Sequence, residues 1–464
     1  MSQVILTLEA KRENAAMLAA ALGQSLDEAA EALELTILIT ANTSDPVACL
    51  VGRELELLLS RTIQRVALNE LGDAPSLEIV IGAAEQVTSA PSLGVGVSQR
   101  QVIIGTNTPR DVCEGVPHIF AVISASYAAG AAIQAAMRGR LPFSSPNPLI
   151  VDFSAFGVTA EALKAPIELG HAYMAGAGAI GNAFLWAARC LDLRGQLELV
   201  DDDTVSSGNL NRQIWFNQRD IGHGKAGRLA SHAQPYFKSL KLVPRKARLQ
   251  DLSERSDEPW LQRLIVAVDS RRARRNLQDE FPGEVFDAST TDIREVVLHH
   301  HKQVTKDACL SCIYEPDSEE SSREQHIADH LGVSLGEVRE ERIAPHSAAK
   351  IVAKYPHMKA EQLTGIAYDT LFKQLCGEGH LRTLEGRRVV APFAFVSVLA
   401  GCLLALEIVR RLTSAASEKG FNYWRVSPWY PPLRRRQVQR PRQAGCAFCG
   451  SAVKQRVNTT LWDR

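Results

Sequence analysis

The sequence predicts an α/β protein with a mostly parallel sheet, and three features near the middle of the chain lead to this prediction. A glycine-rich turn, GAGAIG, joins a strand-like run (HAYMA) to a helix-like run (NAFLWAARCLDL). A second strand, Gln196–Val200, follows and is succeeded by an acid, Asp201. A third buried-strand pattern, Leu264–Val268, is succeeded by another acid, Asp269. Polar residues at the carboxyl ends of alternating strands are typical of open α/β sheets that bind a ligand there.

The glycine turn predicts a nucleotide site. Gly176, Gly178 and Gly181 form the pattern G-x-G-x-x-G. Without β-carbons the chain can turn tightly, and a phosphate can approach the N–H groups at the start of the helix. Asp201 lies 20 residues after Gly181, where a Rossmann-like βαβ unit places an acid on the ribose hydroxyls. This context favours nucleotide binding over a merely structural turn.

The residues after this strand suit a triphosphate. Asp201 and Asp203 alternate about Asp202, so both side chains can face one side of the strand end. Four more polar candidates follow: Asn209, Arg212, Gln213 and Lys225. A guanidinium and an ammonium at one site would neutralise the charge of a phosphate bond as it breaks. The alternative is a solvated polar loop.

Asp269 is a candidate magnesium ligand. It follows a predicted parallel strand at the edge where such sheets bind ligands, and Mg²⁺ is bound through few carboxylates together with phosphate oxygens. Alternatively, Asp269 caps the helix that follows. Four arginines lie directly behind it: Arg271, Arg272, Arg274 and Arg275.

These motifs resemble a known family. GAGAIG, VDDDTV, NLNRQ, DIGHGKA and the strand before Asp269 are similar, in order and spacing, to the adenylation domain of ubiquitin-activating enzymes. They equally resemble the ThiF and MoeB adenylyltransferases, which activate sulfur-carrier proteins. The resemblance covers about residues 170–312 and 390–450. One departure is Gly208 where the family usually has serine before Asn209.

The resemblance implies a role for each matching residue. Asp201 would bind ribose, Asp203 would lie near the metal, and Asp269 would coordinate Mg²⁺. Phosphates would be held by the polar set Asn209, Arg212 and Lys225, with Gln213 also in the nucleotide site. The family usually supplies one more arginine from a partner half, for which Arg12 is our hypothesis.

The cysteines predict a zinc site in a reducing compartment. The chain has nine cysteines, an odd number that cannot pair completely, and its start, MSQVILTLEAKREN, lacks the pattern of a signal peptide. We therefore expect a cytoplasmic protein. Two C-x-x-C pairs, 133 residues apart, can fill one tetrahedral Zn²⁺ shell: Cys309 and Cys312 with Cys446 and Cys449. Redox dithiols and free thiols are the alternatives.

Cys376 is the candidate nucleophile. It follows a helical pattern beside two glycines, with His380 and Arg382 nearby, and an electropositive, reachable setting lowers a thiol's pKa. It lies between the two C-x-x-C pairs, where the resemblance implies a thioester-forming insert. Cys402 as nucleophile, or none at all, remain open.

Three parts are expected along the 464 residues. Residues 151–315 and 389–464 form the active adenylation domain, residues 316–388 form a helical cysteine-bearing insert, and residues 1–150 form a degenerate, inactive copy. The copy is inferred from an internal sequence similarity: VPHIFAVISASYAAG is similar to APFAFVSVLAGCLLA at a displacement of 275 residues. Coincidence between two Ala-rich helices is the alternative. In the copy we expect strands in LTILITANT, LEIVIGA and QVIIGT and a long helix over about 49–68.

Two classes of partner are excluded by composition and pattern. The 52 basic and 52 acidic residues balance, so no charge excess favours nucleic acid. Residues 389–406 carry no charge and are long enough to span a membrane. Pro392 and Glu407, however, bound the run as the ends of a buried helix would.

The expected function is ATP-dependent activation of a ubiquitin-like protein with a free C-terminal glycine. Adenylation would be followed by a thioester on Cys376 and transfer to a conjugating enzyme. A bacterial conjugation pathway, such as an antiviral one, and a homodimer or internal pseudo-dimer fit this expectation. The alternatives are a sulfur-carrier adenylyltransferase, a peptide adenylyltransferase, and a non-catalytic protein that docks a ubiquitin-like partner.

Overall fold

The computed structural model describes residues 6–463 except 71, 73, 138–139, 143, 254–258, 292, 317, 369–370, 373–374, 376–392 and 414–419. It divides the chain into two compact units. The first comprises Met1–Tyr314 and Ala391–Arg464, and the second comprises Glu315–Val390. The first half of the chain and the nucleotide half therefore belong to one unit.

The N-terminal half is built on a six-stranded sheet with the order β2-β1-β3-β4-β5-β6. Its strands are β1 Thr36–Ala41, β2 Arg65–Leu68, β3 Leu77–Ile81, β4 Ser92–Val97, β5 Gln101–Gly105 and β6 Leu149–Asp152. The first four are parallel, and β5 and β6 are antiparallel to their neighbours. Its helices are α1 Leu8–Leu22, α2 Leu26–Ala32, α3 Pro46–Ser60 and α4 His118–Ala136.

The nucleotide half is built on an eight-stranded sheet with the order β14-β13-β12-β11-β10-β7-β8-β9. Its strands are β7 Ile167–Ala175, β8 Leu193–Val200, β9 Leu240–Arg245, β10 Arg263–Val266, β11 Glu284–Thr291, β12 Glu295–Lys302, β13 Tyr423–Val426 and β14 Gln437–Val438. The five strands from β9 to β11 are parallel, and the last three are antiparallel. The predicted α/β class with a mostly parallel sheet is confirmed.

Helices cover both faces of this second sheet. They are α5 Ala160–Lys164, α6 Ala179–Ala188, α7 Lys225–Ala233, α8 Arg271–Gln278, α9 Leu310–Ile313, α15 Ala394–Leu412 and α16 Ala452–Trp462. Helix α15 packs on α6, β11 and β12. Helices α8 and α9 contribute Leu277 and Leu310 to a core with Val266 of β10 and Val285 of β11.

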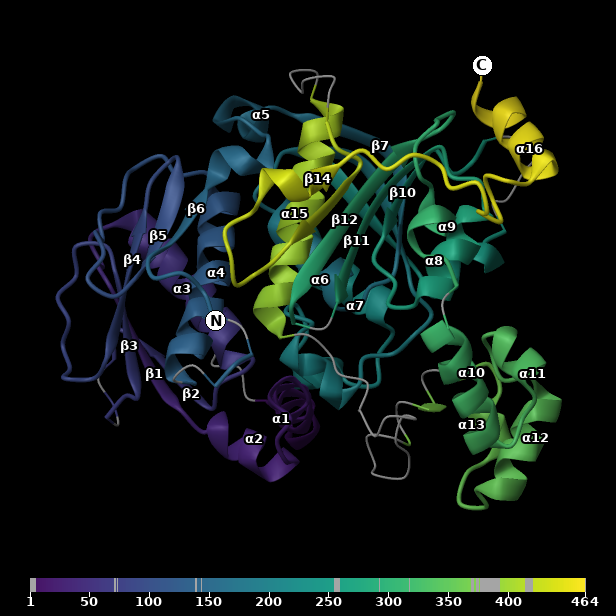
Figure 1. Cartoon of the computed structure of the whole chain (residues 1–464), viewed down its shortest axis with the longest axis horizontal. Helices are drawn as coiled ribbons and strands as arrows, with labels where there is room; N and C mark the ends of the chain where they lie inside the picture. The colour runs from purple at the N-terminus through teal and green to yellow at the C-terminus, as the bar shows by residue number, and fades with distance from the viewer. Residues whose placement is uncertain are drawn as a thin grey trace. The chain divides into compact units, whose positions relative to one another are not determined.

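The two halves share a topology. In each sheet the second strand lies outside the first, and the later strands continue on the other side into an antiparallel pair; the nucleotide half has one more outer strand, β9. A long buried helix then leads to one more antiparallel strand: α4 to β6, and α15 to β13. Figure 1 shows α4 and α15 between the two sheets, where they pack on each other. The shared strand order supports the internal similarity seen in the sequence.

One expectation about a buried helix is confirmed and another is partly wrong. The apolar run expected to be a buried helix is α15, which is buried from Ala394 to Arg410 and continues past Glu407 to Leu412. The helix expected over about 49–68 is wrong at its end: α3 stops at Ser60, and Arg65–Leu68 forms β2 instead. Helix α4 is long and apolar enough to cross a membrane, but 78% of its apolar window is buried inside the protein, as in a core helix.

The second unit is helical. It contains α10 Ser318–Leu331, α11 Leu335–Arg339, α12 Pro345–Lys354 and α13 Ala360–Leu363. Its own core includes Ile327, Leu331, Ile351 and Phe372. Ser334 and Glu337 form a capping box at the start of α11, which satisfies two otherwise unpaired N–H groups.

Candidate active site

The three glycines of the turn between β7 and α6 have different roles. Gly176 has φ of +101°, and a β-carbon there would lie 2.8 Å from the carbonyl of Ala267. A β-carbon on Gly181 would lie 2.2 Å from the carbonyl oxygen of Gly176. These two glycines allow the turn, α6 and the end of β10 to pack closely. Gly178, the N-cap of α6, has nothing within 4 Å of that position, so a phosphate can approach there.

Asp201 ties the end of β8 to this turn. Its carboxylate accepts hydrogen bonds from the backbone N–H of Ala177 (2.7 Å) and of Asp203 (2.9 Å). Burial raises the pKa of Asp201 to about 6, although the charge of Lys225 opposes the shift. The residue lies where a ribose-binding acid is predicted.

The raised pKa predicts that ATP affinity depends on pH. The carboxyl keeps its proton up to about pH 6, and only the ionised form can accept ribose hydroxyls on both oxygens in addition to its backbone N–H donors. ATP affinity should therefore increase about tenfold between pH 5 and pH 7, because one pH unit below a pKa leaves about a tenth of the carboxylate. Calorimetric titration across this range measures it, with Asp201→Asn giving weaker and pH-independent binding.

An ATP affinity of the wild-type protein that does not change with pH would contradict this role of Asp201.

The same pKa shift of Asp201 changes folding stability with pH in the opposite direction. Between the ordinary pKa of 3.8 and about 6 the folded state binds the extra proton, so the stability from this group decreases as pH rises through that window.

Lys225 and Asp203 form an ion pair at the same edge of the sheet. Lys225 is the first residue of α7, and its Nζ lies 2.9 Å from Oδ2 of Asp203. The Lys225 side chain is 12% exposed and that of Asp203 is 46% exposed. The ammonium is thus oriented by an acid that is itself open to solvent.

The NLNRQ segment comprises the end of a 3₁₀ helix, η2 (Ser207–Asn211), and the two residues that follow it, Arg212 and Gln213. Arg212 Nη1 donates to Asn211 Oδ1 at 2.7 Å and to the carbonyl of Gly208 at 3.3 Å. Burial lowers the pKa of Arg212, while the charges of Glu13 and Asp269 oppose the shift. Arg212 is therefore a partly buried cation, 18% exposed, on which the charge of Asp269 acts.

Asn209 and Gln213, which the sequence analysis groups together, have different hydrogen-bond partners. Asn209 Oδ1 accepts the N–H of Ser206 (3.1 Å) and caps η2. Gln213 is 3% exposed, and its Oε1 has no hydrogen-bond partner within the described part of the chain. That oxygen is available to a donor on a ligand.

Asp269 lies exposed in the turn after β10. The helix cap considered as its alternative role belongs to Ser270, whose side chain accepts the N–H of Ala273 at 2.9 Å. Arg274 is buried and donates to the carbonyls of Val268 and Ala288, which fixes the turn. The N-cap of α8 is therefore Ser270 and not Asp269, whose side chain is exposed to solvent.

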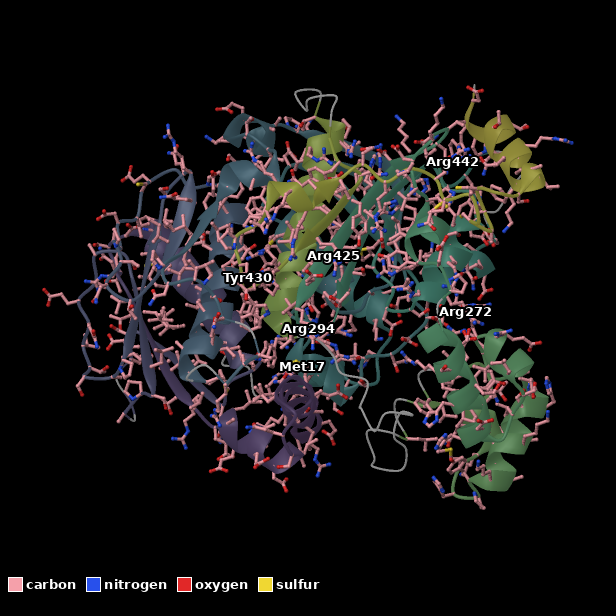
Figure 2. The ribbon with its side chains drawn as sticks, viewed as in Figure 1. Met17, Arg272, Arg294, Arg425, Tyr430 and Arg442 are labelled. Carbon is pink, nitrogen blue, oxygen red and sulfur yellow. The ribbon has the colours of Figure 1, made fainter. Side chains whose placement is uncertain are left out.

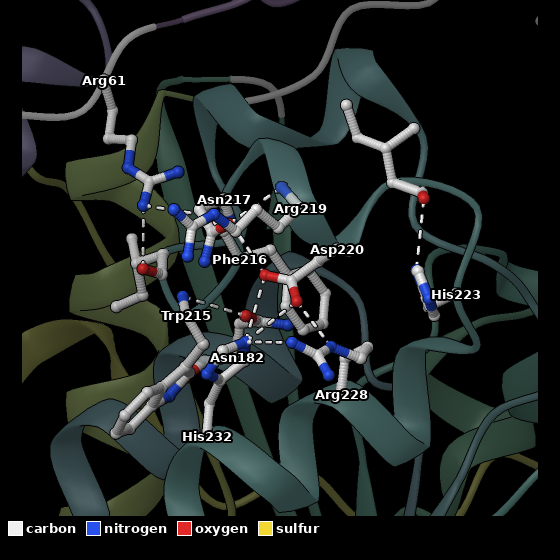
Figure 3. A network of polar contacts seen from close by, with 12 residues as sticks. Arg61, Asn182, Trp215, Phe216, Asn217, Arg219, Asp220, His223, Arg228 and His232 are labelled. Carbon is white, nitrogen blue, oxygen red and sulfur yellow. Dashed lines mark hydrogen bonds and ion pairs between the residues drawn. The ribbon is translucent and has the colours of Figure 1, made fainter.

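Asn182 is a structural residue of the site that the sequence interpretation missed. Its side chain donates to the carbonyls of Ala177 (2.9 Å) and Gly178 (3.0 Å) and accepts the N–H of Trp215. It thereby joins the glycine turn to the segment after Arg212 (Figure 3). Only its position next to Gly181 indicates this role in the sequence.

Asp220 organises the loop that leads to Lys225. It is fully buried and accepts from the N–H of Asn217 (2.9 Å), Arg228 Nε (2.5 Å) and His232 Nε2 (3.0 Å), as Figure 3 shows. Burial alone would raise the pKa of Asp220, but these hydrogen bonds lower it below the ordinary value.

Asp220→Asn should destabilise the protein by about 2–3 kcal/mol, because a buried ionic acceptor is lost and the side-chain donors of Arg228 and His232 lose their charged partner. Urea denaturation measures the change. Asp251→Asn, which alters an exposed ion pair with Arg248, is the control and should change stability by less than about 1 kcal/mol. Equal effects of the two substitutions would contradict the buried network.

Four cysteines converge at the start of α9. Their sulfurs lie within 4.8 Å of one another, with separations of 3.4–3.7 Å among Cys309, Cys312, Cys446 and Cys449. These distances exceed a disulfide bond of about 2.05 Å and match the edges of a tetrahedron with Zn–S bonds of about 2.3 Å. The cluster can hold one metal ion.

Two other candidates have different outcomes. Cys376 lies outside the described residues. Arg12 is exposed on α1, and its neighbour Glu13 lies 3.9 Å from Arg212. Helix α1 therefore covers η2, but the residue that faces Arg212 is an acid. Met17, labelled in Figure 2, lies on the buried side of this helix.

Comparisons with known proteins find relatives of both halves of the chain. The model of the E1 N-terminal domain matches residues 7–159. Uncharacterized protein y4jF of Sinorhizobium fredii is 30% identical over 262 residues, which are 53% of this chain and 49% of that protein.

Named enzymes match shorter stretches. Ubiquitin-activating enzyme E1-like of Saccharomyces cerevisiae is 34% identical over 105 residues, 22% of this chain and 16% of that protein. The NEDD8-activating enzyme E1 catalytic subunit of Dictyostelium discoideum is 33% identical over 105 residues, 22% of each protein. The match covers less than half the length of each of these three relatives.

A crystal structure of E. coli MccB aligns with 77% of this chain and 95% of its own, at 14% identity and a TM-score of 0.38, too low to bear on function. The ThiF family model matches residues 154–448, which is more than half of the chain and contains every nucleotide-site candidate from Gly176 to Asp269. The chain therefore belongs to the ThiF family, within the superfamily of E1-like adenylyltransferases.

Proposed function

We propose that the protein adenylates the C-terminal carboxylate of a ubiquitin-like protein. The observation that carries this proposal is the set of charged residues after β8 and β10: Lys225 pairs with Asp203 after β8, and Asp269, after β10, acts on the pKa of Arg212. A nucleotide that places its ribose on Asp201 and its α-phosphate near Gly178 extends its remaining phosphates toward these cations.

The reaction is a displacement at phosphorus. A carboxylate oxygen of the partner attacks the α-phosphate of ATP, the bond to the β-phosphate breaks, and pyrophosphate leaves from an acyl-adenylate. Arg212 and Lys225 neutralise the charge that develops on the leaving group, and fixed cations in an enclosed site do this without reorganisation. Asp269 and the half-exposed Asp203 are oxygen ligands that fit Mg²⁺, which would neutralise phosphate charge.

The four-cysteine cluster fits structural Zn²⁺. It joins the segment after β12 to the segment after β14, and two backbone N–H groups, of Gln443 and Cys449, point at its sulfurs. Such donors stabilise thiolates. The cluster lies apart from the nucleotide site, so the role we propose for the metal is to fasten the chain.

A second step is proposed for Cys376. Its thiolate would attack the acyl carbon of the adenylate, giving a thioester and AMP, and a conjugating enzyme's cysteine would then accept the acyl group. The resemblance and the position of Cys376 in the insert support this step. A sulfur-carrier or peptide adenylyltransferase would carry out the first step alone.

The thioester is tested with the full chain, ATP, Mg²⁺ and small proteins ending in glycine that neighbouring genes encode. We expect an adduct that reducing agent removes, and Cys376→Ala should abolish it while pyrophosphate exchange persists. Cys113→Ala, at an exposed cysteine, should keep the adduct. If Cys376→Ala retains every downstream transfer, the thioester role is wrong and adenylation alone remains.

A further inference from the structure

The N-terminal half reaches the phosphate-binding segment through one buried arginine. Arg61, directly after α3, is 2% exposed. Its guanidinium donates to three backbone carbonyls of the nucleotide half: Leu210, Ile214 at 2.9 Å and Phe216 at 3.1 Å. These carbonyls lie on both sides of Arg212 in the sequence, so Arg61 fixes the path of the segment that carries it (Figure 3).

The environment of Arg61 makes this contact specific. Among the described residues no carboxylate forms an ion pair with it, and burial is the cause that lowers its pKa, to about 10. The Arg61 Nε has no hydrogen-bond partner among the described residues, so the three carbonyls are the acceptors that offset the cost of burying this cation. Arg61 and the three carbonyls therefore depend on each other.

A second connection leads to the guanidinium of Arg212 itself. Asn14 of α1 is 1% exposed; its Nδ2 donates to the carbonyl of Arg61 at 2.7 Å, and its Oδ1 accepts from Asn211 Nδ2 at 2.9 Å. Asn211 Oδ1 then accepts from Arg212 Nη1 at 2.7 Å. Because the Asn14 amide both donates and accepts here, its orientation sets that of Asn211 and hence of Arg212.

We propose that Asn14 and Arg61 are positioning residues for Arg212, so that the N-terminal half sets the affinity of the active half for the β- and γ-phosphates of ATP. This inference rests on the proposed function, in which Arg212 binds phosphate. A merely structural role would stabilise the protein without distinguishing one nucleotide from another.

The test compares ATP with AMP, which lacks the two outer phosphates. In the full chain, Asn14→Leu, a near-isosteric change, should weaken ATP binding about tenfold, equivalent to about 1.4 kcal/mol, and leave AMP binding within about twofold. Arg61→Met should act in the same direction. Arg53→Met, at an exposed position of α3, is the matched control and should change neither affinity.

Hydrogen exchange supplies a readout that needs no nucleotide. Amides of residues 205–216 should exchange faster in Asn14→Leu, whereas those of β8 should not change. Unchanged ATP affinity, or equal weakening of ATP and AMP, overturns the inference while the proposed function stands. Unchanged exchange in residues 205–216 also overturns the inference. If the wild-type protein binds no ATP, the proposed function is wrong, and the inference that rests on it is overturned as well.

Discussion

Lys225→Met should lower the rate of ATP–pyrophosphate exchange by about 10²–10³-fold, the usual loss when one preorganised charge that stabilises a transition state is removed. The ammonium is 12% exposed and is oriented by Asp203 at 2.9 Å, so it contributes in an environment with little competing water. The assay follows label from pyrophosphate into ATP in the presence of the partner protein.

The folded state should tolerate this substitution. Asp203 is 46% exposed, so water can solvate its carboxylate when the ammonium is gone. Lys238→Met, at an exposed position outside the site, is the control and should keep full exchange. Wild-type exchange rates in Lys225→Met would show that this lysine has no part in phosphate binding.

Cys309→Ser should release the metal and destabilise the protein by about 4 kcal/mol or more, because loss of a structural metal is among the largest effects of a single substitution. Cys309 is 1% exposed and contacts the sulfurs of Cys312, Cys446 and Cys449. Elemental analysis should find one zinc per wild-type chain, and thermal denaturation should show a lower midpoint for the variant.

Cys113→Ser provides the matched control, since Cys113 is exposed and remote from the cluster in sequence. It should retain both the zinc and the wild-type midpoint. A metal-free wild-type protein whose stability does not change on Cys309→Ser would contradict a structural zinc site.

The parts of the fold that local pattern determines could be predicted from the sequence. The strand before Asp269 is a short apolar run, the strand before Asp201 alternates polar and apolar residues, and the turn residues after each mark its end. The edge strand β2 could not be identified in this way. Arg65–Leu68 continues an apolar helical pattern from α3, and only pairing with β1 makes it a strand.

The site shows the same division. Side chains that would contact the nucleotide belong to compact motifs, and the residues that orient them do not. Arg61 lies 149 residues from Leu210, and Asn14 lies 197 residues from Asn211. No spacing rule connects such pairs. The distinction between Asp269 and Ser270 as helix cap likewise depends on backbone geometry at the end of β10, which composition does not fix.

Calorimetric titration of the purified chain with ATP and Mg²⁺ tests the central claim most directly. We expect one binding site per chain, with affinity reduced at least about tenfold in Arg212→Ala, since a charge-assisted contact contributes about 1.5–3 kcal/mol. A wild-type protein that is folded and zinc-loaded yet shows no binding of ATP would contradict the account.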